Sequence, residues 1–76
     1  MMRKEVLSAW GNVAESIQRA SDDEPPRWLC VGWLPEGRSV ELIAVETILG
    51  WLIIHAMTPI QPITAQEITD TKRRTQ

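Results

Sequence analysis

His55 is the residue of this chain best suited to proton-transfer chemistry, and it is the only histidine. An imidazole works as a general base when a second side chain positions it, and Glu41 and Arg38 lie in or beside the neighbouring predicted strand. The alternative is a strand histidine that bonds to backbone groups or to Glu41 and has no catalytic role. The sequence therefore offers His55, Glu41 and Arg38 as a candidate catalytic group and leaves open which face of the sheet His55 occupies.

The single cysteine, Cys30, lies in an apolar run over residues 27–34. A cysteine in such a run usually packs as a small hydrophobic residue, and burial raises the pKa of a thiol, so we expect a structural role. One cysteine and one histidine do not supply the four ligands of a typical zinc site without several carboxylates. We therefore predict no metal and no cofactor.

The chain has four tryptophans and neither phenylalanine nor tyrosine. Trp10 belongs to a predicted helix, whereas Trp28 and Trp33 fall on opposite faces of one predicted strand. Such rings could stack on nucleic-acid bases, but basic residues are not interleaved with them. We therefore expect the tryptophans to pack in the core or at an interface.

A basic cluster lies near the C-terminus and consists of Lys72, Arg73 and Arg74. Each of these cations could bind an RNA phosphate and release a counterion, and the alternative is a solvated terminus. Glu67 and Asp70 lie just upstream and reduce the local positive charge. The cluster is thus a candidate RNA-binding segment.

The 76 residues, of which 43% are hydrophobic and 24% charged, predict one small domain over 1–76. This composition excludes a disordered chain, a collagen-like repeat and a disulfide-stapled mini-protein. The longest apolar run, from Ile48 to Met57, is too short for a membrane helix. We expect a cytoplasmic protein without membrane contact, and the net charge of −2 gives no overall attraction to nucleic acid.

Apolar spacing predicts a first helix that ends before Ser21. The apolar stripe recurs at steps of four, three and four, which is one face of a helix. Its members are Val6, Trp10, Val13 and Ile17. Gly11 inside the helix costs roughly 1 kcal/mol relative to alanine. The acidic, proline-containing segment 21–26 cannot continue the helix and is predicted to be a loop.

Three further segments, 27–34, 39–45 and 51–57, predict a three-stranded antiparallel meander. Segment 27–34 is apolar on both faces, and apolar residues alternate in segment 39–45. The residues between them, 35–38, include the proline and glycine of a type I turn. The third is largely apolar, and Pro59 and Pro62 prevent it from continuing. The sheet therefore follows the first helix in chain order.

A second helix is predicted near the C-terminus. Thr64 and Glu67 have the spacing of a capping box, and Ile63 and Ile68 have the spacing of a hydrophobic staple. The predicted fold class is α+β, with an N-terminal helix, a three-stranded antiparallel meander and a short C-terminal helix.

The pairing of the first hairpin decides which residues share a face. If Leu34 pairs with Ser39, Arg27 lies opposite Glu46. The face expected beneath the first helix comprises Leu29, Val31, Trp33, Val40, Leu42 and Ala44. The opposite face, expected to lack cover, comprises Trp28, Cys30, Leu34, Ile43 and Val45, with Glu41 among them. An uncovered apolar face marks a partner surface, so we expect a homodimer or the binding of another protein.

The chain resembles small prokaryotic toxins of the BrnT-like branch of the RelE/ParE superfamily, which belong to type II toxin–antitoxin systems. Three stretches carry the resemblance, over residues 27–32, 37–45 and 53–57, and the helix that precedes them fits the same arrangement. In the second stretch the resemblance lies in Gly37-Arg38 and in residues 41–45. The resemblance covers roughly residues 3 to 70.

The resemblance implies helices packed on an antiparallel sheet and a metal-independent endoribonuclease that a cognate antitoxin neutralises. By position it implies catalytic roles for Arg38 and His55, with Glu41 as a partner of His55 and Arg27 as an RNA-binding residue. Cleavage of RNA needs a base that activates the 2′-hydroxyl and a cation that stabilises charge on the phosphate, and His55 and Arg38 are suited to these roles.

The chain departs from the family pattern at Met57, where the last strand of such toxins often ends in arginine, and in its acidic balance. The alternative function is therefore a non-catalytic interaction module, either a homodimer or a partner-binding subunit on a degenerate toxin-like fold.

Overall fold

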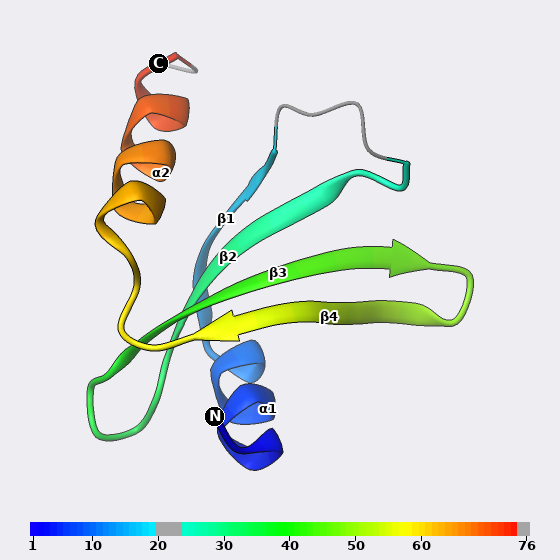
Figure 1. Cartoon of the computed structure of the whole chain (residues 1–76), viewed down its shortest axis with the longest axis vertical. Coiled ribbons are helices and arrows are strands. Elements are labelled where there is room, and N and C mark those ends of the chain that lie inside the picture. Colours follow the sequence, from blue (N-terminus) through cyan, green and yellow to red (C-terminus); the bar gives the residue numbers. More distant parts are fainter. Residues whose placement is uncertain (20–23, 75–76) are drawn as a thin grey trace.

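The computed structural model describes residues 1–19 and 24–74, which form two helices and one four-stranded antiparallel sheet (Figure 1). The elements are α1 (Arg3–Gly11), β1 (Val13–Gln18), β2 (Arg27–Trp33), β3 (Ser39–Thr47), β4 (Gly50–Met57) and α2 (Pro62–Arg74). Strand order in the sheet equals chain order, so β1 and β4 are its edges. The α+β class is confirmed, but the sheet has one strand more than predicted.

The extra strand is β1, because the predicted first helix is wrong beyond Gly11. The Asn12 main-chain N–H donates to the carbonyl of Ala9 at 3.0 Å and its side chain donates to that of Ser8 at 2.9 Å, which ends α1. A bulge early in β1 then places Val13 on one face of the sheet and Ile17 on the other. Residues whose spacing predicts one face of a helix therefore lie on two faces of a bulged strand.

The meander of β2, β3 and β4 is confirmed, but its first register differs by one residue from the prediction. Ser39 pairs with Trp33 and not with Leu34. The Leu34 N–H donates to the carbonyl of Arg38 at 2.9 Å, and Gly37 adopts φ +97° in the turn between them. A slip of one residue moves every side chain of a strand to the other face, so the turn decides both faces of the sheet.

The corrected register places Arg27 opposite Val45 and not opposite Glu46. The face toward α1 comprises Trp28, Cys30, Gly32, Val40, Leu42 and Ala44. The face toward α2 comprises Leu29, Val31, Glu41, Ile43 and Val45. The predicted uncovered face is therefore wrong, since its members divide between the two faces and Cys30, Leu34 and Val45 are buried.

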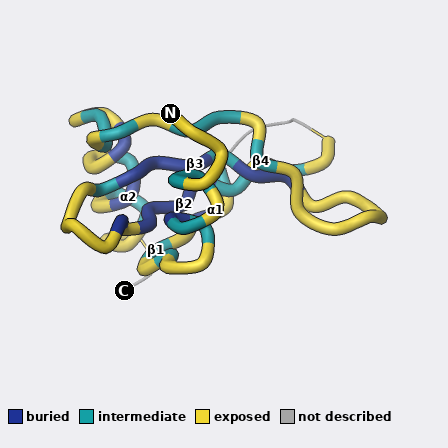
Figure 2. The backbone as a smooth tube through the Cα atoms, turned by 90° about the horizontal axis from the view of Figure 1, so that it is seen from below, coloured by how far each residue is buried: buried dark blue, intermediate teal, exposed yellow. Residues whose placement is uncertain are grey.

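Apolar side chains form two clusters, one on each face of the sheet. The cluster beneath α1 contains Ala9, Cys30, Leu34, Val40 and Leu42. The cluster beneath α2 contains Ile17, Leu29, Val31 and Ile68. Burial follows the central strands and fades toward the end of the β3–β4 hairpin, as Figure 2 shows. The two central strands therefore supply both clusters.

The predicted C-terminal helix is confirmed as α2, but it starts earlier than expected. The carbonyl of Gln61 accepts the main-chain N–H groups of Thr64 at 3.0 Å and Ala65 at 3.1 Å. Pro62 then occupies the first helical position, where its fixed φ and missing N–H are well tolerated. The helix therefore begins at Pro62, two residues before the predicted cap.

The predicted capping box and hydrophobic staple are wrong. The Thr64 hydroxyl donates to Glu41 of β3, and the Glu67 carboxylate binds an arginine after β1. Ile68 is buried against the sheet, whereas Ile63 is 72% exposed, so the two isoleucines do not make a buried staple. Contacts with the sheet replace both local interactions.

Candidate functional site

The Glu41 carboxylate is the polar centre of the face toward α2. Its side chain is almost fully buried, and four donors surround it. Its Oε1 accepts the Gln61 main-chain N–H at 2.8 Å and the Thr64 hydroxyl at 2.9 Å. Its Oε2 lies 3.0 Å from His55 Nε2 and 3.1 Å from Gln61 Nε2. The carboxylate thus ties β3 to β4 and to the first turn of α2.

These contacts keep Glu41 ionised. Burial by itself would raise the pKa of this carboxyl, because it disfavours the charge. Hydrogen bonds from the Gln61 main chain, Thr64, His55 and the Gln61 side chain outweigh burial and lower the pKa below its usual value. An ionised carboxylate only accepts hydrogen bonds, so His55 Nε2 carries the hydrogen of their contact.

His55 lies on the face toward α2, because it pairs with Ile43 of β3. Its imidazole is 34% exposed, in contrast with the carboxylate behind it. With the hydrogen on Nε2, the neutral ring has Nδ1 as its proton acceptor. The contact of His55 with Glu41 that the sequence suggested is present, and it can orient a base toward a group arriving from solvent.

Arg38 lies away from this pair. Its guanidinium bonds to Glu36 at 2.6 Å and to Glu5 of α1 at 2.5 Å. It precedes Ile43, the partner of His55, by five residues, which corresponds to about 16 Å along a strand. The structure brings together His55 and Glu41 and does not bring Arg38 to them.

The candidate RNA-binding residues lie at two further places. Arg27 begins β2. Lys72, Arg73 and Arg74 occupy the last turn of α2, and Lys72 Nζ lies 2.9 Å from a carboxylate oxygen of Glu15. These three residues follow Thr64 by eight to ten positions, or about 12–15 Å along a helix. The basic cluster is therefore at the end of α2 opposite to the Glu41 carboxylate (Figure 1).

The sequence did not single out the ion pair between Arg19 and Glu67. The guanidinium makes two parallel hydrogen bonds of 3.0 Å to the carboxylate, in the bidentate geometry typical of strong pairs. The bonds to Glu67 raise the pKa of Arg19 despite partial burial. This pair joins the end of β1 to α2, and it could be recognised only once residues 13–18 were known to form a strand.

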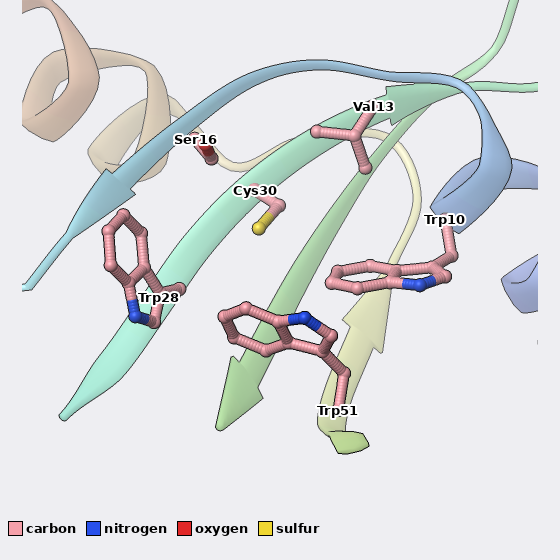
Figure 3. A pocket seen from close by; sticks show the side chains of 6 residues that line it. All are labelled: Trp10, Val13, Ser16, Trp28, Cys30 and Trp51. Carbon is pink, nitrogen blue, oxygen red and sulfur yellow. The ribbon is translucent and has the colours of Figure 1, made fainter. Parts of the chain in front are cut away.

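Three tryptophans meet on the face toward α1, as Figure 3 shows. The ring centroids of Trp10 and Trp51 are 5.8 Å apart with planes at 55°, and those of Trp28 and Trp51 are 6.3 Å apart and nearly perpendicular. Such tilted and edge-on contacts are favoured by aromatic pairs. The expected packing in the core is observed for Trp10 and Trp28, which pack against the cluster beneath α1, whereas Trp51 and Trp33 are each 46% exposed.

The three rings line a pocket of about 220 Å³, which we call the tryptophan pocket. Its lining residues are Trp10, Val13, Ser16, Trp28, Cys30 and Trp51 (Figure 3). Cys30 is 3% exposed, and burial raises the pKa of its thiol. The pocket is therefore an apolar hollow without an ionised group, in contrast with the Glu41 site.

Within residues 1–19 and 24–74, no group of three His, Cys, Asp or Glu side chains is arranged to hold a metal ion. In the same part of the chain, neither helix is long and apolar enough to cross a membrane. No family model, curated protein or solved structure matches the chain. Function is therefore inferred from the geometry of His55 and Glu41 and from the exposed surface.

Proposed function

We propose that this chain is a small type II toxin, an endoribonuclease that needs no metal and is neutralised by a cognate antitoxin. The observation that carries the proposal is a partly exposed imidazole, His55, held 3.0 Å from the buried Glu41 carboxylate. The resemblance of residues 27–32 and 53–57 to BrnT-like toxins supports the same function, and so does the α+β arrangement of helices on an antiparallel sheet.

In this proposal His55 acts as the general base. Its Nδ1 takes the proton of an RNA 2′-hydroxyl, and the 2′-oxygen bonds to the adjacent phosphorus. The P–O5′ bond then breaks, and a solvent water protonates the 5′-oxygen, which gives a 2′,3′-cyclic phosphate and a 5′-hydroxyl. Glu41 positions the ring and stabilises the imidazolium that forms. Arg27, Arg38 and the basic cluster then contact phosphates away from the cleaved bond, because Arg27 begins β2, Arg38 bonds to Glu5 of α1 and the basic cluster ends α2.

The test is inducible expression of the wild type beside His55→Ala, with growth and total RNA followed after induction. We expect the wild type to arrest growth and degrade RNA, and we expect His55→Ala to lower the rate of RNA cleavage by about 10²-fold or more. Met57→Ala is the matched control, because Met57 is 41% exposed and lies on the same face of β4. A folded His55→Ala protein as toxic as the wild type would show that the site is misassigned.

The second candidate function is a non-catalytic interaction module. It is favoured by the apolar side chains that the β3–β4 hairpin exposes. Soluble monomers seldom expose a contiguous apolar patch of several hundred Å² unless a partner binds there. Expression of well-folded protein without growth arrest or RNA loss would favour this candidate over the toxin.

A further inference from the structure

The end of the β3–β4 hairpin projects beyond both helices (Figures 1 and 2). Ile48 and Leu49 form its tip and are essentially fully exposed, at 102% and 95%. The exposed apolar residues of this end of the hairpin, which we call the hairpin patch, are Ile48, Leu49, Trp51, Leu52 and Ile54. Neither helix covers the Ile48–Leu49 tip (Figure 1), whereas Trp51 has Trp10 of α1 on one side and is 46% exposed.

The strand that carries most of the patch is an edge strand. From Gly50 to Met57, β4 contains no Lys, Arg, Asp, Glu or Pro. Natural edge strands usually carry charges or proline that prevent association with other chains. Because β4 lacks these residues, its composition suits a strand that is covered in the assembled protein.

The tryptophan pocket adjoins the hairpin patch. Trp51 belongs to both, and it lies only two residues beyond Leu49 in the chain. Aromatic and small side chains line the pocket, and its surface is mostly apolar. Such a pocket suits an aliphatic side chain. One end of the molecule thus presents an exposed aliphatic projection next to an apolar hollow.

The size of the patch suits a subunit interface. With about 150–250 Å² for a fully exposed large apolar side chain, the exposed fractions of the five residues correspond to roughly 500–850 Å². A stable interface buries about 800 Å² on each partner. A two-fold axis near Leu49 and Trp51 would bring the projection of each copy to the hollow of the other, which gives a closed dimer with both features satisfied.

We infer that the hairpin end of this chain binds a second copy of the same chain, with the Ile48–Leu49 tip of each copy seated in the tryptophan pocket of the other. A second copy is the occupant because the projection and the hollow are complementary and lie on the same end of one molecule. This interface replaces the one expected around Ile43 and Val45, since Val45 is buried and Ile43 packs in the cluster beneath α2. It does not depend on the proposed toxin activity.

The experiment measures the molar mass of the full chain by sedimentation from micromolar to millimolar concentration. We expect the wild type to reach twice the chain mass of 8.6 kDa, and we expect Leu49→Lys to raise the dimer dissociation constant more than about tenfold. Ile63→Lys is the matched control, because Ile63 is 72% exposed on α2, outside the patch, and should leave the constant unchanged. Both positions are exposed, so neither variant should impair folding.

A third variant tests the pocket itself. Ser16 lines the pocket from β1 and is exposed, so Ser16→Leu places an aliphatic group where the tip of the other copy would sit. We expect it to weaken the dimer more than about tenfold as well. A wild type that stays monomeric at millimolar concentration overturns the inference and leaves the patch to a different protein. A dimer that either Leu49→Lys or Ser16→Leu fails to weaken also overturns it.

Discussion

Glu41 is a charged residue between two buried apolar neighbours, Val40 and Leu42. Its position is stable because Gln61, Thr64 and His55 supply donors to both carboxylate oxygens. The same donors fix the start of α2 on the sheet and the orientation of the imidazole. One side chain thus couples the packing of a helix to the geometry of the candidate site.

Replacement of Glu41 by glutamine should destabilise the fold at neutral pH. The variant keeps the side-chain volume, but its amide NH₂ faces donors, so we expect the free energy of unfolding to fall by about 2–4 kcal/mol. The pKa of Glu41 in the folded chain lies below its ordinary value of 4.5, so the carboxylate stabilises the fold above that pH. This stabilisation is lost as the pH falls through the folded-state pKa.

Urea unfolding of the wild type and Glu41→Gln from pH 7 to pH 3 measures this effect. The difference between their free energies of unfolding should shrink as the pH drops below about 4.5. Glu46→Gln, an exposed substitution on the same strand, is the control and should follow the wild type. A difference that stays constant across this range would mean that the charge of Glu41 does not stabilise the fold.

At the scale of single residues, the sequence could suggest His55 and Glu41 as partners because they occupy adjacent predicted strands. It could not supply Gln61 and Thr64, which reach the carboxylate only after the chain has left β4 and begun α2. It also could not separate Arg38 from the pair, since that depends on α1 offering Glu5 on the other side of the sheet. The spacing of residues in the sequence does not predict these contacts, because they form only when distant elements pack together.

At the scale of elements, α1 packs on the sheet through a close approach at Gly32. A Cβ built on Gly32 would lie 2.2 Å from the Ala9 carbonyl oxygen and 2.9 Å from its carbonyl carbon. Those atoms belong to the backbone of α1, which cannot move aside as the end of a flexible side chain could. The helix therefore rests on a position where only glycine fits.

Gly32→Ala should consequently lower the free energy of unfolding by about 1–3 kcal/mol, the usual effect of forcing extra volume into a packed contact. Gly11→Ala is the matched control, because nothing lies within 4 Å of a Cβ built there. Alanine at the end of α1 should leave stability equal or raise it by up to about 1 kcal/mol. Denaturant unfolding measures both variants, and equal losses in the two would contradict the close packing of α1 on β2.

A helix or strand could be predicted from the sequence where its apolar residues follow one regular spacing along the whole element. The segments of β2, β3, β4 and α2 each follow a single pattern and were predicted as such. Val13 and Ile17 have the spacing of one helix face, but they lie in a strand whose bulge places them on opposite faces. Likewise the capping spacing of Thr64 and Glu67 was outweighed by their partners on the sheet, Glu41 and Arg19. Tertiary contacts and an irregular strand explain these errors.

At the scale of the whole molecule, the two apolar clusters lie on opposite faces of one sheet. Cys30 belongs to the cluster beneath α1, and its chain neighbours Leu29 and Val31 belong to the cluster beneath α2. Moving β2 therefore disturbs both clusters at once. A chain of this size has little stability to spare, so we expect it to unfold as a single cooperative unit.

The reactivity of Cys30 reports this cooperativity. Cys30 is the only cysteine in the chain, it is 3% exposed, and burial raises the pKa of its thiol, so a thiol reagent should reach it only when the fold opens. Ile68→Ala, on the opposite face, removes buried volume and should cost about 2–4 kcal/mol. If both faces open together, this distant substitution should speed the labelling of Cys30 by roughly 30-fold or more.

The measurement is the labelling rate of Cys30 in the native protein without denaturant. Ile63→Ala serves as the control, because Ile63 is 72% exposed on the same helix and should leave the rate unchanged. Labelling that Ile68→Ala does not accelerate would mean that the reagent enters through the tryptophan pocket by local opening. In that case the face toward α1 would open without the face toward α2, and the sheet would not be the shared core that its two clusters indicate.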